Sequence, residues 1–274
     1  MIRFEKLQGI GNDFIVVDLL APDPGCDLSQ GPALAKKLCD RKFGIGGDGL
    51  IFLTSGEKEA FAMRMFNPDG SESEMCGNGL RCLAQVVRSH GHSSASSVSI
   101  ETGAGVLQAD FLSDGQVRID MGPARTSRRE IGMAAPSDET FIEQPVGGGF
   151  LGTAVSMGNP HLVIFVPSVD AIDLPGLGRQ FEHHELFPNR TNVHFIEVID
   201  RNTLKQRTWE RGAGATLACG TGACASAVAG FLTGRSERNV EMRLPGGNLR
   251  VEYLENCHVL MTGPATLVYD GVTA

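Results

Sequence analysis

The segments EMCGNGLRC (74–82) and LACGTGAC (217–224) resemble each other and decide how the rest of the chain is interpreted. Two further matches occur in the same order, namely GND with GNP and GPA with a second GPA. All three pairs recur at offsets of 141 to 147 residues. Self-similarity at a nearly constant offset is typical of repeat architectures. The sequence therefore predicts an internal duplication.

The matches define an N-terminal repeat at 1–124 and a C-terminal repeat at 150–265. Between them, residues 125–149 mix charge, proline and glycine without a period, so we expect a linker or an irregular excursion. The tail at 266–274 has an extended pattern that could add an edge strand to either repeat, and so could complete the first one. A chain of 274 residues is long enough for two ordinary domains.

Strand patterns dominate both repeats, and one helix is expected after each cysteine motif. Apolar residues follow the motifs at the i, i+3, i+4, i+7 spacing of an amphipathic helix, and Gly91 and Gly234 are plausible stops. We expect an α+β fold with two similar domains, each a curved antiparallel sheet or barrel around a central helix. The active site is expected in the cleft between them. The helical positions are Leu80, Leu83, Ala84 and Val87, and Ala223, Ala227, Val228 and Phe231.

Composition excludes several classes of protein. The 24 Lys and Arg against 32 Asp and Glu give a net charge of −8, without a basic run for nucleic acid. At 42% apolar residues the chain can bury a core. Arg3, Glu5 and Lys6 interrupt the start where a signal peptide needs an apolar stretch, and no segment is long enough to span a membrane. We expect a cytoplasmic protein with no membrane partner and reduced thiols.

Cys76 and Cys219 each fall at the predicted start of a helix. Unpaired N–H groups and the positive end of the helix dipole favour a thiolate there and would lower the pKa of each thiol. The glycines that follow leave backbone amides uncovered, so that a carboxylate could bind. Two opposed thiols of this kind suit inversion of a carbon that bears a carboxylate, with one removing the proton and the other delivering one.

Other chemical motifs are weaker. The five remaining cysteines are expected to be small buried residues. GIGGDG (44–49) matches a dinucleotide-binding pattern, but a helical stretch precedes it and a strand follows, which is the wrong order. There is no CxxC pair and no HExxH, so we expect no metal and no cofactor. His183 and His184 are expected to lie in a solvated surface segment.

Five segments together resemble the diaminopimelate epimerase family, in the family's order and from about residue 4 to 228. Proline and hydroxyproline enzymes resemble the chain more distantly. The resemblance implies a cofactor-independent isomerase that interconverts LL- and meso-diaminopimelate by a two-cysteine proton transfer, on the path to lysine, and that forms a homodimer. The segments are GNDF (11–14), FNPDGSESEMCGNGLRC (66–82), GNPH (158–161), RTNV (190–193) and WERGAGATLACGTGACA (209–225).

The resemblance assigns a role to each matching position. Cys76 and Cys219 are implied as the catalytic pair, and His161 and Glu210 as residues that tune the pKa of the cysteines. Several of the other positions are equally compatible with turn chemistry or a surface ion pair. The implied substrate-binding residues are Asn12, Asn67, Gly77, Asn78, Asn159, Asn192, Glu210, Arg211, Gly220 and Thr221.

Two positions depart from the family pattern, and two alternatives stay open. Gly49 stands where some members have a glutamine that contacts substrate, and Ala215 stands where members usually have an acidic residue. The first alternative is a racemase or epimerase of the same fold acting on proline, hydroxyproline or histidine. The second is a redox protein in which the two thiols form a disulfide.

Overall fold

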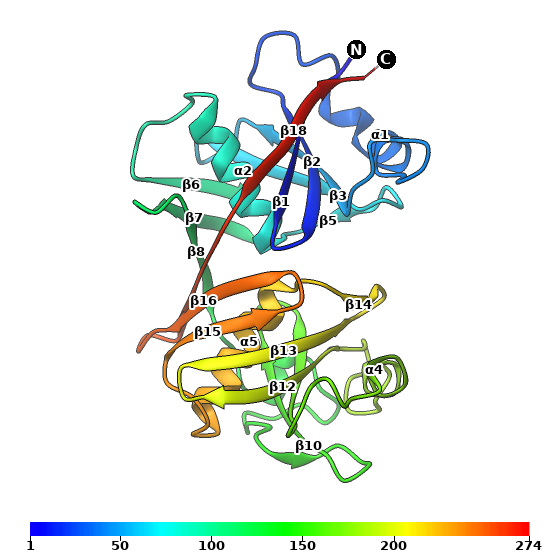
Figure 1. Cartoon of the computed structure of the whole chain (residues 1–274), viewed down its shortest axis with the longest axis vertical. Coiled ribbons are helices and arrows are strands. Elements are labelled where there is room, and N and C mark those ends of the chain that lie inside the picture. The colour runs from blue at the N-terminus through cyan, green and yellow to red at the C-terminus, as the bar shows by residue number, and fades with distance from the viewer. Residues whose placement is uncertain (274) are drawn as a thin grey trace. The chain divides into compact units, whose positions relative to one another are not determined.

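The computed structural model describes residues 1–273, which fall into two compact units (Figure 1). Unit 1 comprises residues 1–120 together with the chain from Gly263 onward, and unit 2 comprises Met121–Thr262. The chain passes from one unit to the other within two strands, β8 (Val117–Pro123) and β17 (His258–Gly263). None of the helices among residues 1–273 is long and apolar enough to cross a membrane.

Unit 1 is a sheet with two helices. The tail strand β18 pairs antiparallel with β1, so it extends the sheet of this unit. The elements of unit 1 besides β8 are β1 (Arg3–Gly9), β2 (Asn12–Asp18), α1 (Gly31–Leu38), β3 (Gly49–Thr54), β4 (Phe61–Phe66), β5 (Glu72–Ser73), α2 (Gly77–Ser89), β6 (Ser97–Thr102), β7 (Gly105–Phe111) and β18 (Thr266–Val272).

Unit 2 has the same kinds of element. Residues 125–149 belong to this unit and contain a short helix and a two-residue strand. The elements besides β17 are α3 (Arg128–Ile131), β9 (Gln144–Pro145), β10 (Leu151–Ser156), β11 (Pro160–Phe165), α4 (Leu174–Glu182), β12 (Asn192–Asp200), β13 (Thr203–Glu210), β14 (Gly214–Thr216), α5 (Gly220–Leu232), β15 (Asn239–Leu244) and β16 (Gly247–Tyr253).

The two sheets are paired in the same way. Unit 1 runs β1, β2, β3, β4, β6, β7, β8, and unit 2 runs β10, β11, β12, β13, β15, β16, β17. Within each sheet the second and third strands are parallel, as are the fourth and fifth, and the other pairs are antiparallel. The expected α+β class is confirmed, with mixed sheets instead of purely antiparallel ones.

The parallel pairs follow from the crossover connections, because parallel neighbours cannot be joined by a tight hairpin. α1 lies in the connection from β2 to β3, and α4 in the connection from β11 to β12. α2 lies in the connection from β4 to β6, and α5 in the connection from β13 to β15. Each cysteine motif therefore begins a crossover helix.

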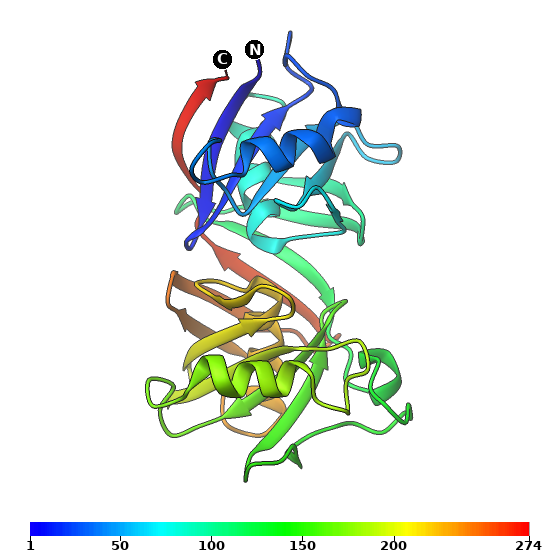
Figure 2. The same cartoon turned by 90° about the vertical axis from the view of Figure 1, so that its right-hand side faces the viewer.

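The helix that follows the cysteine motif is the buried one in each unit. α2 contacts β1, β2, β3 and β7, and its residues Leu80, Leu83 and Val87 are fully buried. α5 contacts β10 to β13 and also β15 and β16, and its alanines and glycines allow this close approach. The expected central helices are thus confirmed. α1 packs on β3 and β4, and Figure 2 shows α1 in blue and α4 in yellow-green, each on one side of its unit's sheet.

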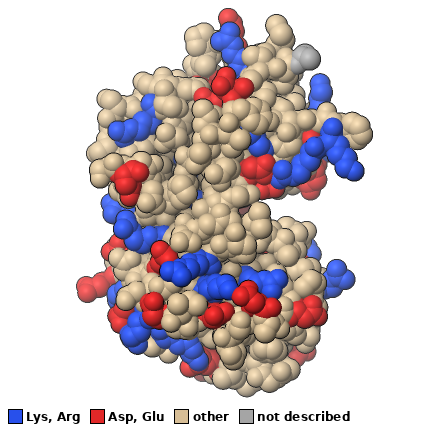
Figure 3. Space-filling model, in the orientation of Figure 1, with Lys and Arg blue, Asp and Glu red and all other residues tan. Residues whose placement is uncertain are grey.

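Charged side chains cover both units. On the face drawn in Figure 3, basic and acidic side chains lie next to one another in small groups. Most of the ion pairs among the described residues are at least partly exposed, such as Arg201 with Glu237 and Arg243 with Glu241. Exposed pairs of this kind contribute about 0–1 kcal/mol each. The fold is stabilised mainly by its apolar cores.

Candidate active site

Both motif cysteines are the residues that immediately precede their helices. Cys76 is the N-cap of α2, with φ −139° and ψ 116°, and Cys219 is the N-cap of α5, with φ −134° and ψ 103°. The carbonyl of each cysteine accepts the first helical hydrogen bond, from Leu80 and Ala223 respectively. The predicted position of both thiols at a helix start is confirmed. The extended backbone of an N-cap residue places its side chain at the helix start, beside the first backbone amides.

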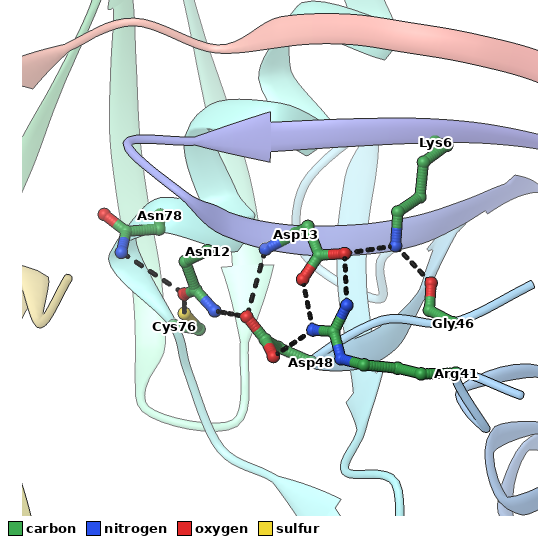
Figure 4. A network of polar contacts seen from close by, with 8 residues as sticks. All are labelled: Lys6, Asn12, Asp13, Arg41, Gly46, Asp48, Cys76 and Asn78. Carbon is green, nitrogen blue, oxygen red and sulfur yellow. Dashed lines mark hydrogen bonds and ion pairs between the residues drawn. The ribbon is translucent and has the colours of Figure 1, made fainter. Parts of the chain in front are cut away.

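The Cys76 thiol lies against two asparagines. Its Sγ donates to Oδ1 of Asn12 at 3.7 Å, and Asn78 donates to the same oxygen at 3.2 Å (Figure 4). Nδ2 of Asn12 donates to Oδ2 of Asp48 at 2.6 Å. Because the amide nitrogen is held by Asp48, the amide oxygen must point at the thiol. Three of the predicted substrate or catalytic residues, Asn12, Cys76 and Asn78, are therefore brought together.

Asp48 also belongs to a network of charged side chains within unit 1. Arg41 bridges Asp48 and Asp13 at 2.7 and 2.6 Å, and Lys6 lies 2.6 Å from the other oxygen of Asp13 (Figure 4). The Lys6 ammonium also donates to the carbonyl of Gly46. Burial raises the pKa of Asp13, but hydrogen bonds and charges from Arg41 and Lys6 outweigh it and lower the pKa to about 2. The network fixes the strand end that carries Asn12.

Glu210 and Thr221 surround the Cys219 thiol. The side chain of Glu210 is hydrogen-bonded to the thiol, Oγ1 of Thr221 lies 3.8 Å from Sγ, and the N–H of Gly222 also contacts it. Glu210 is the last residue of β13, so the strand end aims its carboxylate at the helix start. The structure brings the predicted Glu210, Cys219 and Thr221 together.

The pKa of Cys219 differs from the expectation. Burial raises the pKa of this thiol well above its ordinary value, and the negative charge of Glu210 raises it further. The N–H of Gly222 and the hydroxyl of Thr221 lower the pKa by less than that. The prediction that the helix start lowers the pKa of both thiols is therefore wrong for Cys219. A buried site without a neighbouring cation favours the neutral thiol.

A chain of hydrogen bonds runs behind the Cys219 helix. Asn159 binds Nε2 of His161 at 2.9 Å, Nδ1 of His161 binds His194 at 2.9 Å, and His194 binds Thr208 at 3.0 Å. Burial lowers the pKa of His161 well below its ordinary value, with His194 and Arg211 acting in the same direction. Burial lowers the pKa of His194 to about 3. Both rings are therefore neutral at physiological pH.

Both ring nitrogens of His161 are bonded, one to Asn159 and the other to His194. His194 connects His161 to the Cys219 helix, because its ring packs against Gly222 in the first turn of α5. A Cβ placed on Gly222 would lie 2.2 Å from Cε1 of His194. Only glycine fits there. The second glycine of the motif is thus explained by packing as well as by access to the helix-start amides.

Asn192 connects three strand ends of unit 2. Its side chain donates to the carbonyl of Pro160 at 3.0 Å and accepts the N–H of Arg211 at 3.0 Å. The Arg211 guanidinium is exposed and donates to the carbonyl of Asn189. Asn192 therefore holds the segment from which Arg211 projects.

Glu182 braces the same segment from α4. Its carboxylate accepts Nε1 of Trp209 at 2.8 Å and the N–H of Gly212 at 3.0 Å, and it lies 3.2 Å from Arg190. Glu182 is almost fully buried. The turn that follows Glu210 is thereby fixed on both sides.

The remaining predicted positions lie elsewhere in their units. Asn67 is in a turn, where it donates to Ser71. Ala215 is exposed on β14 opposite Trp209. A Cβ on Gly49 would lie 2.8 Å from the terminal methyl group of Met65, so a glutamine there would require this flexible side chain to move. Gly77 and Gly220 are the buried first residues of the two helices.

The sequence did not single out Asp48, Asp13, His194 or Glu182. Asp48 lies in GIGGDG, which had been considered only as a nucleotide motif and in fact places a carboxylate beside Asn12. His194 interrupts the short apolar run VHFI (193–196), and this polar residue among apolar ones was the available signal.

The fold is that of a class of racemases, epimerases and related enzymes. The chain superimposes on a probable proline racemase from Agrobacterium radiobacter with a TM-score of 0.69 at 15% identity, covering 100% of this chain and 93% of that one. It superimposes on a PhzF-family phenazine biosynthesis protein from Bacillus anthracis with a TM-score of 0.71 at 17% identity, covering 98% of each chain.

Sequence comparison narrows the class to one family. The diaminopimelate epimerase family model matches residues 4–127 and 153–268. The chain is 47% identical over 279 residues to the diaminopimelate epimerase of Moorella thermoacetica, covering 98% of each chain. It is 48% identical over 284 residues to that of Trichodesmium erythraeum, covering 99% of each. The chain belongs to the diaminopimelate epimerase family, as the resemblance implied.

Proposed function

We propose that the protein interconverts LL- and meso-diaminopimelate without a cofactor, with Cys76 and Cys219 acting on opposite faces of one α-carbon. The observation that carries the proposal is the repeated thiol at a helix N-cap, each bonded to an acceptor side chain from a neighbouring strand or turn. Family membership supports the substrate, since the relatives compared are diaminopimelate epimerases.

In the proposed reaction one cysteine acts as a thiolate and removes the α-proton. The other acts as a thiol and supplies a proton to the opposite face, so the configuration inverts and the protons balance. Asn12 and Glu210 accept hydrogen bonds from the two thiols and hold them in place. Glu210 and burial favour the neutral form of Cys219, which is the form that a proton donor needs.

The helix-start backbone is the proposed site of the reacting carboxylate. The first residues of α2 and α5 are Gly77 and Asn78, and Gly220 and Thr221. Their amides lie at the positive ends of two helices and suit an anion, whose charge grows as the α-proton leaves. Oδ1 of Asn78 is buried without a hydrogen-bond partner among the described residues, so it is available to a substrate ammonium.

The distal end of diaminopimelate carries a second ammonium and a second carboxylate. We propose that Arg211 binds that carboxylate through two parallel hydrogen bonds, with Asn67, Asn159 and Asn192 as further polar contacts. The exposed guanidinium on a braced turn supports this role. A substrate without the second carboxylate would lose the charged hydrogen bonds to the exposed Arg211, which are worth ~1.5–3 kcal/mol or roughly 10- to 100-fold in specificity.

Deuterium incorporation tests the mechanism. Reduced protein is incubated with LL-diaminopimelate in deuterated water, and both stereoisomers are analysed early in the reaction. Two opposed thiols predict that the product carries deuterium while recovered substrate stays largely unlabelled. Equal early labelling of both pools would refute the two-cysteine mechanism. Efficient racemisation of proline, hydroxyproline or histidine in the same assay would instead favour the alternative substrate.

Substitutions test the individual roles. Cys76→Ala and Cys219→Ala should each abolish inversion, because the pair acts as a unit. Arg211→Lys should lower kcat/KM for diaminopimelate by roughly 10- to 100-fold, the equivalent of a charged hydrogen bond worth ~1.5–3 kcal/mol. Arg129→Lys is the matched control, because Arg129 forms an exposed ion pair with Asp138. Equal activity of the two lysine variants would exclude Arg211 from substrate binding.

We also propose that the two units arose by duplication and that the protein is a cytoplasmic homodimer. The identical strand order of the units supports the duplication. Apolar side chains of Leu267, Val268, Tyr269 and Val272 are exposed on β18, which supports a partner copy. Sedimentation equilibrium tests the dimer, and Tyr269→Glu should shift the protein toward monomer.

A further inference from the structure

A second group of chemically reactive side chains lies in unit 1, apart from the cysteine motif. Asp18 is the last residue of β2, His90 is the C-cap of α2, and His92 follows two residues later. Nδ1 of His90 and Nε2 of His92 both lie 2.7 Å from Oδ2 of Asp18. The three potential ligand atoms lie within 4.8 Å of one another. One carboxylate oxygen and two imidazole nitrogens thus converge on one point.

The end of α2 holds the two histidines in this arrangement. The N–H of His92 bonds to the carbonyl of Val87, and that of Gly91 to the carbonyl of Arg88, which together form a Schellman motif. Gly91 has φ 73°, a conformation that glycine adopts without strain. The reversal of the chain at Gly91 brings both rings to the same side of the helix end. Their convergence is therefore built into the backbone.

The three side chains make contacts of the kind that orient the ligands of a metal site. Nε2 of His90 lies 2.6 Å from Oε1 of Glu5 on β1, and Oδ1 of Asp18 accepts the N–H of Leu20 at 2.9 Å. A carboxylate on the far nitrogen of a histidine fixes the ring and leaves the near nitrogen for a metal. Phe61 packs beside His92, with ring centroids 6.4 Å apart. Each of the three side chains is therefore positioned by a further contact: Asp18 by the N–H of Leu20, His90 by Glu5 and His92 by Phe61.

We propose that Asp18, His90 and His92 bind a divalent transition-metal ion of the zinc type. Two imidazoles and one carboxylate are a recognised donor set for such ions, with a fourth position left for water. Ligands about 2.1 Å from a tetrahedral ion lie about 3.4 Å apart. The present 2.7 Å separations would have to open by well under 1 Å. The side chains are 5% to 32% exposed, so an ion can reach them.

The site went unrecognised in the sequence because its ligands do not form a local motif. His90 and His92 are separated by one residue, but Asp18 comes from a strand more than 70 residues earlier. The proposed ion would join the C-terminal end of α2 to the end of β2. Because Cys76 is the N-cap of α2, the ion would stabilise the helix that positions this cysteine. It would take no part in proton transfer.

Binding is tested by titrating the full-length protein, first treated with a chelator, with Zn²⁺ in a calorimeter. The expected result is one ion per chain and a higher unfolding temperature with Zn²⁺. His92→Ala should weaken binding more than 10-fold and abolish the thermal shift. Glu5→Gln should weaken binding about 10- to 100-fold, as expected for loss of the outer carboxylate. His183→Ala, at the C-cap of α4, is the control, because this exposed histidine lies in unit 2.

Cobalt distinguishes the histidine site from the thiols. Co²⁺ bound to a thiolate gives a sulfur charge-transfer band, whereas Co²⁺ on nitrogen and oxygen ligands does not. The proposal predicts the absence of this band and unchanged stoichiometry after alkylation of the accessible cysteines. It is wrong if the wild-type protein binds Zn²⁺ no more tightly than His92→Ala, or if alkylation removes the binding. Circular dichroism of metal-free His92→Ala checks that the variant is folded.

Discussion

Replacing Gly222 by alanine tests whether the Cys219 helix depends on its contact with His194. An added Cβ would lie 2.2 Å from Cε1 of His194, 2.7 Å from Nε2 and 2.9 Å from Nδ1. The ring is fully buried and hydrogen-bonded on both sides, to His161 at 2.9 Å and to Thr208 at 3.0 Å. The ring or the helix must move by roughly 1 Å to restore an ordinary van der Waals contact.

The expected cost has three parts. Overpacking of a buried site costs about 1–3 kcal/mol, and loss of one hydrogen bond of His194 costs about 1 kcal/mol. Alanine returns up to about 1 kcal/mol through its higher helix propensity. Gly222→Ala should therefore destabilise the protein by about 2 kcal/mol, or roughly 4–8 °C in Tm. Activity should fall as well, because the displaced turn carries Cys219.

The matched control is Gly79→Ala, since Gly79 is the third residue of α2 as Gly222 is of α5. A Cβ on Gly79 would lie 2.7 Å from Cδ1 of Ile51, which is the end of a side chain that can rotate. We expect a cost below about 1 kcal/mol there. Differential scanning calorimetry and an epimerase assay under reducing conditions measure both effects.

A double-mutant cycle with His194→Ala tests whether the clash with the His194 ring causes the loss of stability. Removing the ring creates room, so Gly222→Ala should cost much less in that background, and the coupling should be about 1–3 kcal/mol. If Gly222→Ala has the same effect with and without the imidazole, the clash is not the cause and the reasoning fails.

The remaining predictions concern the network of unit 1. Asp13→Asn leaves the buried Lys6 ammonium without its carboxylate and should cost about 3 kcal/mol in urea unfolding, whereas Arg41→Gln, at an exposed pair, should cost about 1 kcal/mol or less. The folded pKa of Asp13, about 2, is below its unfolded value of 3.8. Its stabilisation is therefore complete above about pH 4 and is lost as the pH falls toward 2. The stability difference between wild type and Asp13→Asn should stay constant above about pH 4 and shrink as the pH falls toward 2. Asp48→Ala should lower kcat on the order of 10-fold, because Asn12 is no longer held toward the thiol, and unchanged kcat would exclude that role.

Local signals in the sequence were sufficient for the two cysteine helices. The N-cap position, the apolar spacing and the closing glycine all lie within about 16 residues of each cysteine, so they can be read without tertiary information. α4 was missed because its sequence, LPGLGRQFE, contains a proline and two glycines that oppose a helix interior. Burial of Phe181 and the brace from Glu182 to Trp209 compensate for this.

Site residues that belong to a sequence motif could be predicted, whereas residues that contact the site from other parts of the chain could not. Asn12 and Glu210 were identified through the family resemblance, and the structure places both beside a thiol. Asp48 and His194 act on those residues or their helix from other strands and loops. The pKa of Cys219 was misjudged because burial, which outweighs the helix start, is a property of the folded chain.

The side chains that accept hydrogen bonds from the two thiols differ in charge, although the strand order of the two units is the same. Cys76 meets the neutral amide of Asn12, and Cys219 meets the carboxylate of Glu210. In a symmetric dimer of single units the two surroundings would be identical, since one gene would encode both. Joining the units in one chain removes that evolutionary constraint, so each thiol can acquire its own neighbour by mutation. The covalent link thus permits the two thiols to differ in the charge of their neighbours, although each begins an equivalent helix.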